Sequence, residues 1–168
     1  MRKIRQRAVF GANCYWGAEA AFSKAEGVLD TNVGFMGDSL CQRNAPSSDQ
    51  DAKDRNQVEV VMVDFDAEVI SYGELIDVFW GCHNSSHPVY RAEDGKPSLE
   101  RSVIFVADKQ QRKMAEDAMA VAVAINRLDA LITTAIEDVG HFHRAAEEDQ
   151  RYLERNEGAV CSLKGAAE

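Results

Sequence analysis

The sequence has too few basic residues for a protein that binds nucleic acid. Its 168 residues include 19 lysines and arginines against 28 aspartates and glutamates, which gives a formal net charge of −9 at pH 7. Such a charge repels a phosphate backbone, because binding there depends on cationic side chains that displace its counterions. We therefore expect no nucleic acid among the partners of this chain.

Long hydrophobic runs are also missing. No apolar stretch approaches the roughly 20 residues that a membrane-spanning helix requires, and the basic start of the chain is followed by only a short apolar segment. A chain of this length, with 45% hydrophobic residues, is long enough to bury one core but short for two domains. We expect a soluble, cytoplasmic protein that does not bind membranes, with one domain over residues 1–168.

Cysteines are few and far apart. Four are too sparse for a small disulfide-bonded scaffold, and because they lack the paired spacing of a zinc site we expect no metal. In a reducing compartment, scattered cysteines are either small buried hydrophobic side chains or redox-active thiols, and only local context separates the two. The four are Cys14, Cys41, Cys82 and Cys161.

What the sequence does contain is a succession of strand and helix patterns. β-branched and apolar runs predict strands, and apolar residues at helical spacing predict helices. The expected strands are 6–11, 28–35, 58–65, 102–106 and 131–137, and the expected helices are 16–26, 71–83, 109–125 and 147–155. Ser71 and Glu74 form a capping-box pattern at the start of the second helix. This order favours an α+β sandwich in which helices pack on a mixed sheet.

Cys14 is the cysteine whose context favours chemistry. It lies between the end of a predicted strand and the start of a predicted helix, where free backbone N–H groups and the helix dipole stabilise a thiolate. Tyr15 and Trp16 follow directly and offer an apolar wall for a small substrate group. The alternative is a buried cysteine beside core aromatic residues, since cysteine is among the most buried residue types.

The segment around Cys14 resembles the signature Gly-Cys-Phe-Trp-Gly of the peptide-methionine (S)-S-oxide reductase family. Asn13 stands in place of the first glycine, and Tyr15 in place of phenylalanine. The likeness extends over nearly the whole chain, through segments at 19–22, 27–35, 58–66, 70–75, 101–105 and 142–161. It implies a ferredoxin-like two-layer α+β fold and the thiol-dependent reduction of methionine sulfoxide or a related small sulfoxide, without a cofactor.

The resemblance also implies roles for individual residues. Cys14 would attack the sulfoxide sulfur as a thiolate, and Glu59 would protonate the departing oxygen, which requires partial burial that raises its pKa. The sulfenic acid left on Cys14 would condense with Cys161, carried on a mobile tail at 156–168. Thioredoxin or another dithiol would then reduce this disulfide.

Other residues have less definite roles. Tyr15 and Trp16 would hold the methyl group of the substrate. Cys41, in the polar loop at 38–56, is an alternative resolving thiol, and Cys82, at the end of an apolar helix, is expected in the core.

The chain departs from the family pattern around the substrate oxygen. A tyrosine expected near 44–47 is missing, and Glu100 stands where a second tyrosine precedes the arginine-serine pair. Two such phenols would each contribute about 1 kcal/mol or more to binding a developing oxyanion. We name Asp94, which matches a family aspartate if one residue is inserted, and Glu100 as substrate-binding residues. Glu100 would suit a cationic or amine-bearing substrate, unless it is an ordinary exposed glutamate.

Two alternative functions remain open. One keeps the fold and Cys14 but acts on a different sulfur or carbonyl substrate, with Glu59 and Glu100 as acid and base. The other is a non-catalytic redox-sensing or binding protein, in which Cys14 and Cys161 form a disulfide without turnover.

Overall fold

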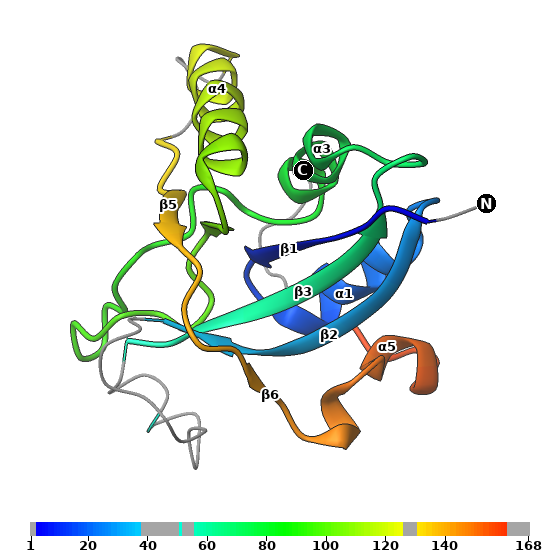
Figure 1. The fold of residues 1–168 in the computed structure, drawn as a ribbon. Coiled ribbons are helices and arrows are strands. Elements are labelled where there is room, and N and C mark those ends of the chain that lie inside the picture. The colour runs from blue at the N-terminus through cyan, green and yellow to red at the C-terminus, as the bar shows by residue number, and fades with distance from the viewer. Residues whose placement is uncertain (1–2, 38–50, 52–55, 126–130, 161–168) are drawn as a thin grey trace.

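A six-stranded mixed sheet forms the centre of the molecule, with strand order β5-β4-β1-β3-β2-β6 (Figure 1). The structure is a computed structural model and describes residues 3–37, 51, 56–125 and 131–160. The strands are β1 (Arg5–Gly11), β2 (Val28–Met36), β3 (Val58–Asp66), β4 (Val103–Val106), β5 (Ala135–Asp138) and β6 (His143–Arg144). β4 and β5 run parallel, and the other neighbouring pairs run antiparallel.

The long helices all pack on one face of this sheet. The helices are α1 (Tyr15–Ser23), α3 (Tyr72–Gly81), α4 (Lys109–Ile125) and α5 (Tyr152–Arg155), with a 3-10 turn at Glu147–Asp149. Buried residues of α1, α3 and α4 share one apolar cluster with alternate residues of β1, β2, β3 and β4. The remaining alternate strand residues form a smaller cluster on the other face, to which no described helix contributes. The expected α+β sandwich of helices on a mixed sheet is confirmed.

Stacked aromatic rings fix α1 and α3 over the central strand β1. The ring of Phe10 in β1 lies 5.0 Å from that of Phe22 in α1 and 5.4 Å from that of Phe79 in α3, measured between centroids. All three side chains are fully buried. Because aromatic rings bury large areas in defined geometries, this cluster fixes α1 and α3 relative to β1. The link between β1 and α1 is thereby held in place.

Most of the expected elements are present. β1, β2, β3 and β4 match the expected strands, and α1, α3 and α4 match the first three expected helices to within a few residues. The capping box is confirmed, since Ser71 N donates to Glu74 Oε2 at 2.8 Å and Glu74 N donates to Ser71 Oγ at 3.2 Å. The strand expected at 131–137 begins only at Ala135, and β6 was not expected.

The expected helix at 147–155 is wrong as a single helix. It divides into the 3-10 turn and α5, separated by Arg151 in the left-handed conformation at φ 51°. The division follows from contacts with the rest of the fold. Gln150 donates to Val33 O and accepts from Val33 N, both at 2.9 Å, and Arg151 N donates to the buried carboxyl of Glu19 at 2.8 Å. These bonds tie the segment to β2 and α1 and interrupt the helix.

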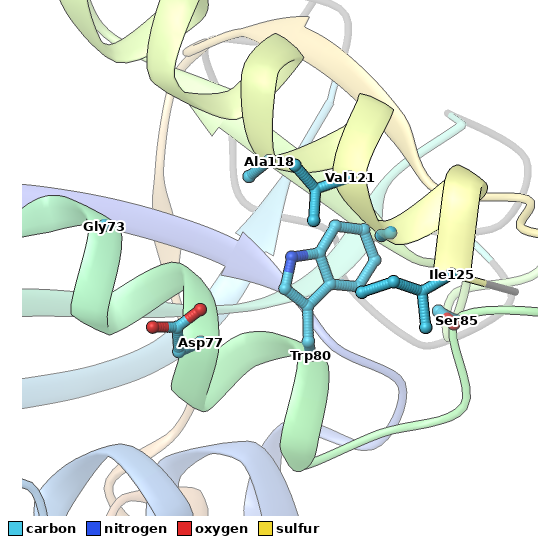
Figure 2. A pocket seen from close by; sticks show the side chains of 8 residues that line it. Gly73, Asp77, Trp80, Ser85, Ala118, Val121 and Ile125 are labelled. Carbon is cyan, nitrogen blue, oxygen red and sulfur yellow. The ribbon is translucent and has the colours of Figure 1, made fainter.

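The outer half of α4 extends beyond the sheet (Figure 1). A hollow of about 580 Å³ lies between this half and α3, and Figure 2 shows the Trp80 ring reaching toward Val121 and Ile125 across it. None of the residues named above for chemistry lines this hollow. Among the described residues, no helix is both long and apolar enough to cross a membrane.

Candidate active site

Cys14 lies where β1 passes into α1. It is the residue directly before the first turn of α1, its backbone is extended there, and its side chain is half-buried. The preceding strand approaches β3 closely at Gly11, where an added Cβ would lie 2.7 Å from Val58 Cγ1. The sulfur is therefore at the N-terminal end of a helix, as expected, where backbone N–H groups favour negative charge.

Asn13 makes the turn between strand and helix. Its φ of 59° is left-handed, a conformation that glycine and asparagine adopt more readily than other residues. This explains why asparagine fits at a position where the resembled signature has glycine. The side chain is buried, and its amide bonds across the fold: Nδ2 donates to Glu100 O at 2.8 Å, and Oδ1 accepts from Asn84 N at 2.8 Å.

Glu59 reaches the start of α1 from β3. Its Oε2 accepts a hydrogen bond from Tyr15 N at 3.2 Å, and the residue is half-buried. The carboxyl group thus caps a helix whose first N–H groups have no partner within the helix. Its own backbone N donates to Leu99 O at 2.8 Å, so the segment before Glu100 lies alongside.

Three reactive side-chain groups lie close together at the start of α1. The Cys14 sulfur, a Glu59 carboxyl oxygen and a Glu100 carboxyl oxygen all lie within 4.8 Å of one another, and each residue is half-buried. Three elements far apart in sequence supply them. A thiolate and two carboxylates are also donors that a divalent cation accepts.

Arg101 holds together the two segments that carry the carboxyl groups. Its buried guanidinium donates to Gln57 O and Ser98 O, both at 3.1 Å, and to Asn56 O at 3.0 Å. Burial lowers its pKa from the ordinary value. Because a guanidinium group has five N–H donors in a fixed geometry, one arginine can bind carbonyl groups of two segments at once and hold them together.

Cys14 is disulfide-bonded in this structure. Cys82 is free, whereas Cys41 and Cys161 lie outside the described residues. A cysteine paired in this way has a sulfur that another thiol can reach, which is what a catalytic or redox-active cysteine requires. The choice between Cys161 and Cys41 as resolving thiol stays a prediction, and so does the mobile tail, because the structure describes the chain only as far as Val160.

The two aromatic residues after Cys14 have different surroundings. Tyr15 is buried, with its ring 5.8 Å from that of Phe35, whereas Trp16 is half-buried and stacks on Tyr152 of α5 at 3.9 Å between centroids. Trp16 therefore lies between the site and the C-terminal segment. Sequence reasoning did not single out Tyr152 as its partner.

Asp94 lies apart from the three-group cluster, in the exposed loop that precedes Glu100. It forms an ion pair with Arg91 and accepts from Lys96 N at 3.0 Å. A pocket of about 370 Å³ opens beside this loop, and Glu100 lines it together with His87, Tyr90, Arg91, Glu93 and Ser98 among others. Asp94 is not among these lining residues. Its contacts order the loop, while Glu100 connects the pocket to Cys14.

Sequence reasoning missed three residues that shape this site: Asn13, Asn84 and Arg101. Asn13 offered a signal, because an asparagine in a strand-to-helix turn often replaces glycine where the backbone is left-handed. The carbonyl partners of Arg101 gave no local signal.

Comparisons with known proteins agree with this geometry. A family model described as peptide methionine sulfoxide reductase matches residues 6–168. The chain is 39% identical over 158 residues to the peptide methionine sulfoxide reductase MsrA of Methanothermobacter thermautotrophicus, covering 94% of this chain and 92% of that protein.

The chain belongs to the peptide methionine sulfoxide reductase family.

Solved structures of this family share the fold. Methionine sulfoxide reductase A of Corynebacterium diphtheriae superposes with a TM-score of 0.75 at 27% identity, covering 94% of this chain and 78% of that one. Mxr1 from Saccharomyces cerevisiae in reduced form gives a TM-score of 0.74 at 25% identity, covering 95% and 90%. The expected family and its fold are confirmed.

Proposed function

We propose that this chain reduces methionine sulfoxide, free or within a protein, through the thiol of Cys14. The observation that carries the proposal is the cluster of the Cys14 sulfur with the Glu59 carboxyl group at the start of α1. A nucleophile beside a proton donor is what this reduction needs, and relatives of this chain carry the name of the activity.

The reaction begins with attack of the Cys14 sulfur on the sulfoxide sulfur. Glu59 protonates the oxygen, which transfers to Cys14 as a sulfenic acid while the thioether is released. Cys161, or Cys41 in its place, then forms a disulfide with Cys14, and thioredoxin or another dithiol reduces it. The reducing cytoplasm supplies such dithiols, and that location is part of the proposal.

The substrate side chain binds between the aromatic residues and the loop before Glu100. Trp16 and Tyr15 contact the methyl group of the substrate through dispersion interactions. Asp94 keeps the loop ordered through its ion pair with Arg91. Glu100 places a carboxyl group at the mouth of the neighbouring pocket. This favours sulfoxides with a nearby amine, so free methionine sulfoxide should be a better substrate than its N-acetylated form.

A single assay tests the activity. The reduced protein is mixed with methionine sulfoxide and dithiothreitol, and the methionine formed is measured for the natural chain, Cys14→Ser and Cys82→Ser. We expect multiple turnovers with the natural chain and with Cys82→Ser, and none with Cys14→Ser. A natural chain that stays inactive while its Cys14 alkylates readily would reject sulfoxide reduction and favour a different substrate for this thiol.

The resolving thiol is identified by a second assay. Cys161→Ser and Cys41→Ser are compared in single turnovers without added reductant, and sulfenic acid is trapped with dimedone. The variant that lacks the resolving thiol should accumulate the trapped adduct on Cys14. Accumulation in Cys41→Ser alone would assign the role to Cys41 instead of Cys161.

A further inference from the structure

A carboxyl oxygen of Glu100 lies within 4.8 Å of both the Cys14 sulfur and a carboxyl oxygen of Glu59. Carboxyl groups this near to each other can pass a proton between them through one water. Both also repel a thiolate. The site therefore holds two acid-base groups around one sulfur, and the reaction described above uses only one of them.

Asn13 holds Glu100 in this place. Its Nδ2 donates to the Glu100 carbonyl oxygen at 2.8 Å and to the Asn84 carbonyl oxygen at 3.3 Å, while its Oδ1 accepts from Asn84 N. The side chain is 1% exposed, so water cannot replace these bonds readily. The residue adjoining Cys14 is thus bonded directly to the residue that supplies the second carboxyl group.

We propose that Glu100 and Glu59 work as a pair that moves one proton from the Cys14 thiol to the sulfoxide oxygen, and that Asn13 is the residue that positions Glu100 for this. Glu100 accepts the proton as the thiol attacks, and Glu59 donates a proton to the oxygen. This deepens the proposed function and rests on it.

The step balances. The S–H bond of Cys14 and the substrate sulfur–oxygen bond break, while a sulfur–oxygen bond to Cys14 and an O–H bond form. The Cys14 sulfur loses two electrons and the substrate sulfur gains them. Glu100 takes up one proton and Glu59 gives up one. Once a proton has passed from Glu100 to Glu59, both carboxyl groups are back in their starting states.

The charge of Glu100 is tested with three variants. Glu100→Gln keeps the shape but cannot accept a proton, Glu100→Asp keeps a carboxyl group, and Glu68→Gln makes the same change at an exposed residue beyond the end of β3 opposite to Glu59. Because a positioned acid or base contributes about 10²–10⁴-fold to a rate, Glu100→Gln should lower kcat about a hundredfold. Glu100→Asp should retain more activity than Glu100→Gln, and Glu68→Gln should equal the natural chain.

The reverse order of Glu100→Gln and Glu100→Asp would show that shape matters and charge does not, and would overturn the inference. An unchanged kcat in Glu100→Gln would also overturn it, yet leave the proposed function intact as long as Cys14→Ser is inactive. Inactivity of the natural chain would instead contradict the proposed function itself.

The positioning role of Asn13 is tested by a double-mutant cycle. Asn13→Gly suits the left-handed backbone, so the fold should persist, but the bonds to Glu100 and Asn84 are lost. We expect kcat to fall about tenfold in the natural background and to stay unchanged in the Glu100→Gln background. Equal losses in both backgrounds would mean that Asn13 does not act through Glu100.

Discussion

Two described cysteines lie at opposite ends of helices, and the end decides their chemistry. Cys14 precedes the first residue of α1, at the end of the helix whose backbone N–H groups favour negative charge. Cys82 follows the last residue of α3, where carbonyl oxygens are exposed, and its Sγ donates to Phe79 O at 3.5 Å. Burial raises the pKa of Cys82 to about 12. A cysteine at the N-terminal end of a helix is thus placed where negative charge is favoured, whereas Cys82 at a C-terminal end behaves as a small apolar residue.

The carboxyl groups around Cys14 complicate this contrast. A helix N-terminus favours a thiolate, but Glu59 and Glu100 within 4.8 Å of the sulfur oppose one. The helix end and the acid pair therefore act in opposite directions on the resting thiol.

The largest expected difference between the two cysteines is in alkylation. A reduced double variant, Cys41→Ser with Cys161→Ser, leaves only Cys14 and Cys82, and timed iodoacetamide labelling is followed by mass spectrometry of the peptides. Since only thiolates react, Cys14 should be modified at least about a thousandfold faster than Cys82 near neutral pH. In denaturant both should react alike. Comparable alkylation rates of Cys14 and Cys82 in the folded protein would contradict the difference in reactivity between the two cysteines.

The residue after Cys82 gives the next largest effect. His83 Nδ1 lies 2.6 Å from Phe79 O, so it donates there, and Nε2 lies 2.7 Å from Ser102 Oγ. Burial, with a smaller effect of the nearby His87, lowers the pKa of His83 to about 4 against the opposing bond to Phe79.

The sign of the pH effect follows from this lowered pKa. Between about pH 6.5 and about pH 4 the unfolded chain takes up a proton that folded His83 does not, so stability is lost as the pH falls through this window. The full loss is about 3 kcal/mol. Urea unfolding at both limits should show this loss in the natural chain and a smaller one in His83→Gln. Equal pH dependence in both proteins would mean that His83 is charged in the fold.

The local elements of this fold were predictable, because they depend on patterns within a few residues. Alternating β-branched residues marked β3, and the Ser71 and Glu74 pair marked the start of α3. The place of Cys14 between strand and helix followed from the same local reading. Its pairing with Glu59 did not, and came only from the resemblance to a family.

The contacts that complete the site were not predictable from one sequence. Asn13 bonds to residues 71 and 87 positions away, and Gln150 bonds to Val33 at a separation of 117. No periodicity encodes such partners, because buried amide groups bond to whichever carbonyl groups the fold brings near them. The same contacts explain why the helix expected at 147–155 is broken.

Two glycines that precede the two cysteines by a few residues offer a matched pair of substitutions. Gly11→Ala places a Cβ 2.7 Å from Val58 Cγ1 and 3.3 Å from Arg101 O, so β3 and the arginine segment must shift. Gly81→Ala, next to Cys82, meets nothing within 4 Å. Overpacking should cost Gly11→Ala about 2 kcal/mol and reduce kcat. Gly81→Ala should leave kcat unchanged and be neutral or slightly stabilising in urea unfolding. Equal effects would show that the backbone approach at Gly11 does not support the site.

The smallest expected effect comes from replacing the unreactive sulfur itself. In Cys82→Ser the hydroxyl group can donate to Phe79 O as the thiol does, although a half-buried hydroxyl gains less from its apolar surroundings. We expect a loss of about 1 kcal/mol or less in the free energy of unfolding, with kcat and KM unchanged. Urea titration and the sulfoxide assay measure the two quantities on the same preparation. A fall in kcat without a fall in stability would give Cys82 a part in catalysis, and the contrast between the two helix ends would then fail.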